Sequence, residues 1–346
     1  MQQSCFLWWE FLRQKASSVI GIETERDIRY FAYARHALAE ALRICKCGPG
    51  DFVLVPEFIC RDVLSSIHAV GSTPVFYPVD RTLSPTNLLN AQRCKAVLAV
   101  NYFGFAQDLT PFREYCLQSG ATLIEDNAHG FLSKDSDGNL LGTRTGLGIT
   151  SIRKTVRLIN GAALHVSGSE NLSLVGDQLN FQQSRLPKGF VLRKLSAQIQ
   201  RSTRVPALSF FQFAIRIARL VTTGSRLPRS TQESETELPS PAAPHSSVLK
   251  LIQSLEPSVE ILRRQQLFNK VLGRVKDLDI DPIFHQLEAG TSPYGFAFIS
   301  GRSSVQRVQK KLRGLSVEVI HWPDLPDAVS VADDHFYRNV WVVNFL

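Results

Sequence analysis

Several features that mark other protein classes are missing from this sequence. The 346 residues contain no run of about 18 uncharged apolar residues, so we expect no membrane-spanning helix. The first segment, MQQSCFLWWEFLRQK (1–15), lacks a basic lead followed by a small-residue cleavage site. We interpret it as an N-terminal helix and not as a signal peptide, and we therefore expect a cytoplasmic protein.

The cysteines lack the spacing of a metal site. The six cysteines stand at positions 5, 45, 47, 60, 94 and 116, and only Cys45 and Cys47 form a close C-x-C pair. A structural zinc site needs four ligands, which usually come as two such pairs, so we expect no metal. Reduced thiols are the ordinary state of cysteine in the cytoplasm.

Acidic residues are absent from one long stretch. Residues 178–232 carry ten basic side chains and no Asp or Glu, whereas the remaining 29 basic residues stand against 31 acidic ones. The net charge of +8 is therefore local. Within this stretch, SFFQFAIRIARLV (209–221) combines Phe and Arg at helical spacing, which suits an interfacial helix at an anionic membrane. A helix packed on the protein's own core and a binding site for a sugar-linked diphosphate are the alternatives, and we expect no nucleic acid partner.

The first half of the chain alternates short apolar runs with helical stretches. The apolar runs predict buried strands at 52–56, 73–80, 95–103, 121–128, 147–152 and 162–166, and helices are predicted at about 34–46, 60–70 and 108–119. This alternation implies right-handed crossovers and a mainly parallel sheet, which binds ligands at the carboxyl ends of its strands. We predict an α/β fold with a large domain at residues 1–175.

The second half predicts a linker and a smaller domain. Residues 176–250 are interpreted as a basic helical segment followed by a flexible linker, since 224–247 is rich in Ser, Pro and Glu. Residues 251–346 are interpreted as a small C-terminal α/β domain. Its pattern predicts a helix over 248–275, a strand at 294–300, a helix at 303–314 and strands at 316–323 and 340–346.

Polar side chains follow two of the predicted strands. Asp126 and His129 follow the apolar part ATLIE (121–125) of one strand, and Ser151 and Lys154 lie at the end of the next. Pyridoxal phosphate needs a lysine amine, a carboxylate against its ring nitrogen, and hydroxyl or N–H donors for its phosphate. Each residue also has a plainer interpretation: Asp126 as a helix cap, His129 as a structural histidine and Lys154 as a solvated lysine.

An ordered series of segments resembles the DegT/StrS family of sugar aminotransferases, which are fold-type-I enzymes that use pyridoxal phosphate. The segments are GPGDFVLVPEFIC (48–60), GSTPVFYPVD (71–80), KAVLAVNYFGFAQDL (95–109), LIEDNAHG (123–130), SIRKT (151–155) and NGAAL (160–164). HWPDLP (321–326) resembles the family's Trp-Pro signature in the small domain. The resemblance implies a mainly parallel central sheet flanked by helices, pyridoxal 5'-phosphate as cofactor, and a homodimer.

The resemblance also implies a role for individual residues. Lys154 stands at the lysine that binds the cofactor, Asp126 at the partner of the ring nitrogen, His129 beside the 3-hydroxyl, and Ser151 at a phosphate ligand. Because dehydrating relatives carry His where this chain has Lys154, amino transfer is implied. The implied reaction moves an amino group, typically from glutamate, to a keto-sugar, most often nucleotide-linked, in polysaccharide or secondary-metabolite synthesis.

The chain departs from the family at the cofactor's phosphate and ring. Ala34 and Arg35 stand where the family opens its first large helix with a pair that begins with Gly. Arg35 could bind phosphate by charge, but Ala34 lacks the conformational range of Gly. Cys60 stands where an aromatic ring often stacks on the cofactor, with Phe58 and Tyr102 as substitutes.

These departures leave two alternatives open. The chain could be a weakened or inactive relative that acts as a membrane-associated partner through 209–221. The family usually has a further strand and helix after the Trp-Pro segment, whereas this sequence stops soon after it. It could instead transfer amino groups to a small substrate that is not a sugar.

Overall fold

The computed structural model describes residues 26–168 without 157, residues 171 and 173, and residues 232–345 without 241, 246–247, 249–251, 253–254 and 316. The predicted N-terminal helix and the segment 209–221 lie outside the described residues, as do residues 224–231 of the predicted linker, and the predicted domain boundaries stay predictions. Within the described part, no helix is both long and apolar enough to cross a membrane.

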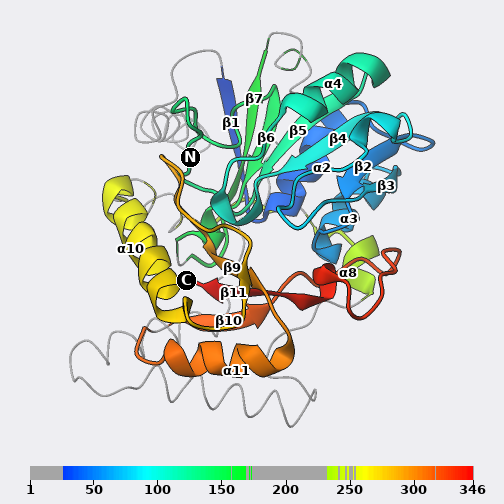
Figure 1. The fold of residues 1–346 in the computed structure, drawn as a ribbon. Coiled ribbons are helices and arrows are strands. Elements are labelled where there is room, and N and C mark those ends of the chain that lie inside the picture. The colour runs from blue at the N-terminus through cyan, green and yellow to red at the C-terminus, as the bar shows by residue number, and fades with distance from the viewer. Residues whose placement is uncertain are drawn as a thin grey trace.

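A seven-stranded sheet forms the centre of the larger part (Figure 1). The strand order is β1-β7-β6-β5-β4-β2-β3, in which β2 to β6 pair in parallel and β7 runs antiparallel to both β6 and β1. The strands are β1 (Arg26–Phe31), β2 (Phe52–Pro56), β3 (Thr73–Tyr77), β4 (Ala96–Val100), β5 (Thr122–Asn127), β6 (Leu147–Thr150) and β7 (Ala162–Ser167). The predicted mainly parallel sheet is confirmed.

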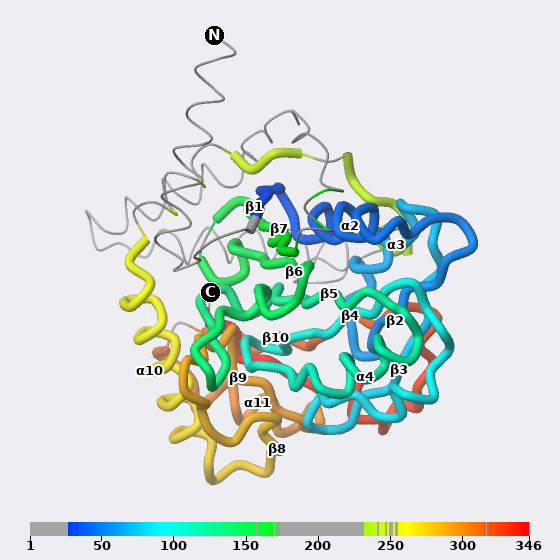
Figure 2. Tube along the Cα trace, turned by 90° about the horizontal axis from the view of Figure 1, so that it is seen from above, coloured from blue at the N-terminus to red at the C-terminus, as the bar shows by residue number. Residues whose placement is uncertain are grey.

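Helices cover both faces of this sheet. Figure 2 shows α2 (Ala34–Ile44) and α4 (Thr110–Ser119) on opposite sides of the strands, while α3 (Leu64–His68) follows a short 3-10 turn at Arg61–Val63. The helix α2 can lie close to the strands because its buried side includes small residues such as Ala37 and Ala41. Every residue of β4 is buried, as the unbroken apolar run AVLAV predicts for a strand covered on both faces.

The smaller part is an antiparallel sheet with two helices. Its strand order is β10-β11-β9-β8. The strands are β8 (Asp281–Pro282), β9 (Gly295–Ile299), β10 (Glu318–His321) and β11 (Val340–Asn344), and the helices are α10 (Pro257–Val275) and α11 (Arg302–Lys311). The helix α10 begins with Pro257 in its first turn, where a missing N–H costs nothing, so it starts later than the apolar pattern predicts.

The two parts share one hydrophobic core. The rings of Phe58 and Phe103 from the large part pack against Trp322 from the small part, with centroids 5.2 Å and 4.9 Å apart. The Tyr337 hydroxyl accepts a hydrogen bond from the backbone N–H of Val79 at 2.9 Å. These contacts fix the small sheet against the carboxyl ends of the large sheet.

Candidate functional site

The carboxyl ends of β5 and β6 bring three of the predicted residues together. Asp126 lies in β5, opposite Val100 of β4 and Ile149 of β6, and His129 follows three residues later. Lys154 ends a short 3-10 turn, η4 (Ile152–Lys154), directly after β6. The Nζ atom of Lys154 lies 3.2 Å from Nε2 of His129.

The hydrogen bonds of His129 assign its protons. The backbone N–H of Phe103 donates to Nδ1 of His129 at 3.4 Å, so Nδ1 is an acceptor. A neutral imidazole then carries its proton on Nε2, the atom that faces the lysine. This N–H can donate only to a neutral amine, because an ammonium group has no lone pair.

The electrostatics agree with a neutral pair. Burial lowers the pKa of Lys154, and the charge of Arg153 adds to this, while Cys60 and Asp126 oppose it. Burial also lowers the pKa of His129 well below its usual value, with the Lys154 charge as a second cause. A lysine whose pKa is lowered is more often a free amine near neutral pH, which is the form that acts as nucleophile and base.

Asp126 is held in place by its own turn. Its Oδ1 atom accepts a hydrogen bond from the N–H of Ala128 at 2.8 Å, and the side chain is buried. Burial raises the pKa of this carboxyl, whereas the Ala128 bond and the Lys154 charge lower it. A cation placed against Asp126 would therefore stabilise its ionised form.

Aromatic rings surround His129. Its ring stacks on Phe103 with centroids 5.5 Å apart and on Tyr294 with centroids 4.7 Å apart. Trp322 approaches edge-on at 5.2 Å. The HWPDLP segment and the start of β9 thus bring small-part residues to the imidazole and limit its rotation.

Positive charge gathers at the start of α2. The guanidinium groups of Arg35 and Arg153 each lie 5.4 Å from the centroid of the Tyr33 ring, which precedes α2. Among the described residues, Asp62 pairs with Arg35 at 3.9 Å, and the buried Nε atom of Arg153 has no hydrogen-bond partner. Two cations next to a helix N-terminus favour a bound anion.

The structure places the remaining predicted residues as follows. Ser151 is buried and caps η4, and its carbonyl accepts from the N–H of Lys154 at 3.3 Å. Cys60 precedes the turn before α3; burial raises its pKa to about 11, and the Lys154 charge opposes this. Phe58 and Tyr102 are buried in the shared core, where the Tyr102 hydroxyl donates to the carbonyl of Phe58 at 2.7 Å.

These residues fit the cofactor that the resemblance implies. Lys154 offers an amine, Asp126 a buried carboxylate and His129 an imidazole within one strand-end cluster. Arg35 and Arg153 would hold a phosphate by charge, and the buried Nε atom of Arg153 is a donor without an acceptor in the part of the chain that the structure describes. Ala34 lies in the first turn of α2 as an ordinary helical residue.

Three residues of this neighbourhood were not predicted from the sequence. Arg153 stands next to Lys154 in the chain, and only the structure shows that it lies over the Tyr33 ring. Tyr294 and Arg264 come from more than a hundred residues further along the chain, and no local pattern connects them with Lys154. Only the contacts described here could identify them.

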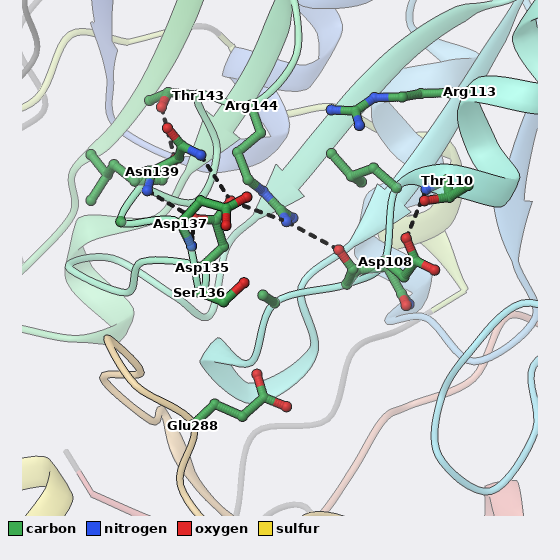
Figure 3. Close-up of a pocket in the computed structure, with 15 residues that line it drawn as sticks. Asp108, Thr110, Arg113, Asp135, Ser136, Asp137, Asn139, Thr143, Arg144 and Glu288 are labelled. Atoms are coloured by element: carbon green, nitrogen blue, oxygen red, sulfur yellow. Dashed lines mark hydrogen bonds and ion pairs between the residues drawn. The ribbon is translucent and has the colours of Figure 1, made fainter.

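A separate open pocket of about 760 Å³ lies at the loops after β4 and β5 (Figure 3). Asp108, Asp135 and Glu288 line it together with Arg113 and Arg144. Arg144 forms an ion pair with Glu125, with Nε and Oε1 2.8 Å apart. Neither Asp126 nor Lys154 lines this pocket.

Residues 31–161 match the DegT/DnrJ/EryC1/StrS aminotransferase family, which confirms the resemblance predicted for this segment. Over 115 residues the chain is 33% identical to a dTDP-4-dehydro-2,3,6-trideoxy-D-glucose 4-aminotransferase of Saccharopolyspora spinosa. That alignment covers 32% of this chain but only 29% of the relative's length.

Solved structures extend the likeness to nearly the whole fold. Helicobacter pylori PseC, an aminotransferase involved in the biosynthesis of pseudoaminic acid, has a TM-score of 0.64 at 14% identity and covers 96% of this chain and 84% of that chain. S. venezuelae DesV has a TM-score of 0.62 at 19% identity and covers 97% and 83%. The predicted fold-type-I class is confirmed.

Proposed function

We propose that this protein is a pyridoxal-phosphate-dependent aminotransferase that transfers an amino group to a nucleotide-linked keto-sugar, with glutamate as the donor that the family resemblance implies. The observation that carries this proposal is the 3.2 Å contact between Lys154 Nζ and His129 Nε2 beside the buried carboxylate of Asp126. Amine, imidazole and carboxylate meet where a mainly parallel sheet presents ligands.

Each residue has a distinct task in this proposal. When bound, the cofactor supplies an electron-accepting ring that stabilises the charge left when the amino donor loses its α-proton. Lys154 binds the cofactor and, once released, moves that proton as a base and an acid, for which its lowered pKa suits it. Asp126 would hold the ring nitrogen and favour its positive form. His129 would orient the 3-hydroxyl, and Ser151 and Arg35 would hold the phosphate.

The sugar substrate is supported by relatives. The Saccharopolyspora protein is named for a dTDP-linked 4-dehydro sugar, and PseC for the biosynthesis of pseudoaminic acid. The match in sequence lies in the segment that carries Asp126, His129 and Lys154. A cytoplasmic homodimer belongs to the same proposal, by resemblance to the family, and analytical ultracentrifugation would test the dimer.

A spectroscopic experiment tests the function. Purified protein mixed with pyridoxal phosphate should develop a protein-bound visible absorption band, and Lys154→Ala should abolish it. Lys95→Ala is the matched control, because Lys95 is exposed at the start of β4, away from the strand ends. Glutamate alone should then convert the band and release 2-oxoglutarate, and a keto-sugar should restore it.

The outcomes separate the possibilities. If the wild-type protein stays colourless after reconstitution, the cofactor assignment fails. If colour forms and glutamate leaves it unchanged, the assignment of an amino transfer from this donor fails.

A further inference from the structure

A fully buried arginine links α10 to the lysine turn. The side chain of Arg264 is 0% exposed, and burial lowers its pKa to about 10. Its Nε atom donates to Glu260 at 2.8 Å, one turn earlier in α10. A buried guanidinium is stable only if its donors are satisfied, so the remaining partners of Arg264 determine what it holds in place.

The remaining donors of Arg264 reach two backbone segments that border the site. Nη2 donates to the carbonyl of Thr155, the residue after Lys154 at the end of η4. The end of a helical turn leaves carbonyls without partners, and a cation is favourable there. Nη1 donates to the carbonyls of Pro293 and Tyr294 at 2.9 Å and 3.2 Å.

These contacts close a ring around the reactive pair. Arg264 holds the backbone of Thr155, which is bonded to Lys154, and it holds the backbone of Tyr294. The Tyr294 ring stacks on His129, and His129 contacts the Lys154 amine. The Arg264 guanidinium therefore fixes the backbone beside Lys154 and the ring that packs on His129, the two residues of the 3.2 Å contact.

We propose that Arg264 is the positioning residue that holds the Lys154 amine against the His129 imidazole, so that a helix of the small part sets the reactivity of a lysine in the large part. This inference rests on the proposed function in that Lys154 is taken as the reacting amine. Arg264 itself touches no reacting atom.

The neighbouring arginine provides a matched control. Arg263 shares the carboxylate of Glu260, with contacts of 2.8 Å and 2.6 Å, and donates to the carbonyl of Phe345 at 3.0 Å. Its side chain is 44% exposed, and its hydrogen bonds to described residues lead neither to η4 nor to Tyr294. A substitution at 263 thus disturbs the same helix and the same acid without touching the lysine turn.

Competitive labelling of amines in the cofactor-free full chain tests the proposal. The protein is treated with acetic anhydride over a range of pH, and the modification of Lys154 is followed by peptide mapping. With Arg264→Met the turn is released and Lys154 gains solvent, so the labelling midpoint should rise by about one pH unit. Arg263→Met should leave it unchanged. In the cofactor-loaded protein, the pH midpoint of the visible band should shift with Arg264→Met only.

A second variant keeps the test decisive. Folding is checked by circular dichroism, and if Arg264→Met fails to fold, Arg264→Lys takes its place. A lysine keeps the charge but cannot reach both carbonyl groups as the guanidinium fork does, so a smaller rise is expected. A folded variant with the wild-type midpoint would overturn the proposal, as would an equal shift with Arg263→Met. Since labelling needs no cofactor, a wild-type protein that stays colourless would contradict the proposed function and leave the positioning role of Arg264 to be decided by the labelling.

Discussion

The imidazole of His129 contacts Lys154 Nζ through Nε2, at 3.2 Å, while its Nδ1 atom accepts the backbone N–H of Phe103 at 3.4 Å. Both nitrogens are therefore engaged in a buried ring that burial keeps neutral, with its pKa well below the usual value. This arrangement has a consequence for the pH dependence of stability.

As the pH falls below about 6.5, the unfolded chain binds a proton at His129 that the folded protein does not. The free energy of unfolding should then fall by about 1.4 kcal/mol per pH unit until the folded-state pKa is reached. His129→Gln should remove this dependence. Urea unfolding at pH 7.5, 6.5 and 5.5 measures it, with His68→Gln, an exposed histidine at the end of α3, as control. An unchanged pH slope in His129→Gln would contradict the neutral assignment.

Asp126→Asn should separate cofactor binding from chemistry. The amide keeps the size of the side chain and loses its charge, so the visible band should still form, while kcat for amino transfer should fall by about 100-fold or more. Stopped-flow measurement of the half-reaction with glutamate checks this. Asp108→Asn, in a loop of the separate pocket, should leave the rate unchanged. A full rate in Asp126→Asn would exclude the carboxylate from the reaction.

Arg61 joins the large part to the Trp-Pro loop and to α8 (Glu233–Thr236). It lies 3.0 Å from Asp327 and 3.4 Å from both Asp324 and Glu235, with 14% of its side chain exposed. Arg61→Met leaves three carboxylates facing one another and should lower the free energy of unfolding by about 1–3 kcal/mol.

The control for Arg61 is Arg43, whose 3.2 Å pair with Glu40 is half exposed on the arginine side. Arg43→Met should cost less than about 0.5 kcal/mol. Chemical denaturation at low and high salt measures both variants. Equal losses of unfolding free energy in Arg61→Met and Arg43→Met would mean that the ion pairs of Arg61 with its three carboxylates do not contribute extra stability.

Gly104 lies where the backbones of the two parts meet. Its φ is +91°, and an added Cβ would lie 2.7 Å from the Ser292 carbonyl oxygen and 3.2 Å from that of His129. Gly104→Ala should cost about 1–3 kcal/mol and disturb the His129 loop. Gly273→Ala, inside α10 with nothing within 4 Å of the new atom, should raise stability by about 1 kcal/mol. Thermal unfolding distinguishes the two, and similar changes in both would contradict the close approach.

A small cavity of about 10 Å³ behind the strand ends should hold one ordered water. The Tyr30 hydroxyl, Asn127 Oδ1 and Thr150 Oγ1 line it and have no hydrogen-bond partner in the described structure. The orientation of the amide is fixed, because Asn127 Nδ2 donates to the Gly130 and Leu141 carbonyls at 3.0 Å and 2.7 Å. A high-resolution crystal structure checks this, and Thr150→Val should cost about 1 kcal/mol. A dry cavity in that crystal structure would refute the expectation.

The strands of the large sheet differ in how much their sequences reveal. AVLAV in β4 is apolar throughout because both faces are covered, so its strand is evident from sequence. The strand RDIRYF of β1 is not evident from sequence, because it contains a charged residue, Arg29, that is buried and pairs with Asp27 at 3.4 Å and Glu40 at 3.6 Å. A charged residue predicts an exposed position, and only the structure shows its partners on β1 and α2.

The candidate site shows the same division. Asp126 lies near the end of β5, His129 and Lys154 follow strands in the sequence, and the parallel topology brings consecutive strand ends to one edge. Local pattern could not reveal the surroundings of His129, because Tyr294 and Trp322, which pack against its ring, come from the far end of the chain.

The amino-acid sequence by itself determined the order of the strands and helices that follow β1 in the large part, since apolar period and turn residues act over a few neighbours. It also placed an amine, an imidazole and a carboxylate at the ends of adjacent strands. Only the tertiary structure decided that the amine meets the imidazole, that two arginines flank Tyr33, and that Arg264 holds the lysine turn. Those relations join residues far apart in the chain, and they depend on a shared core whose burial lowers the pKa values of Lys154, His129 and Arg264.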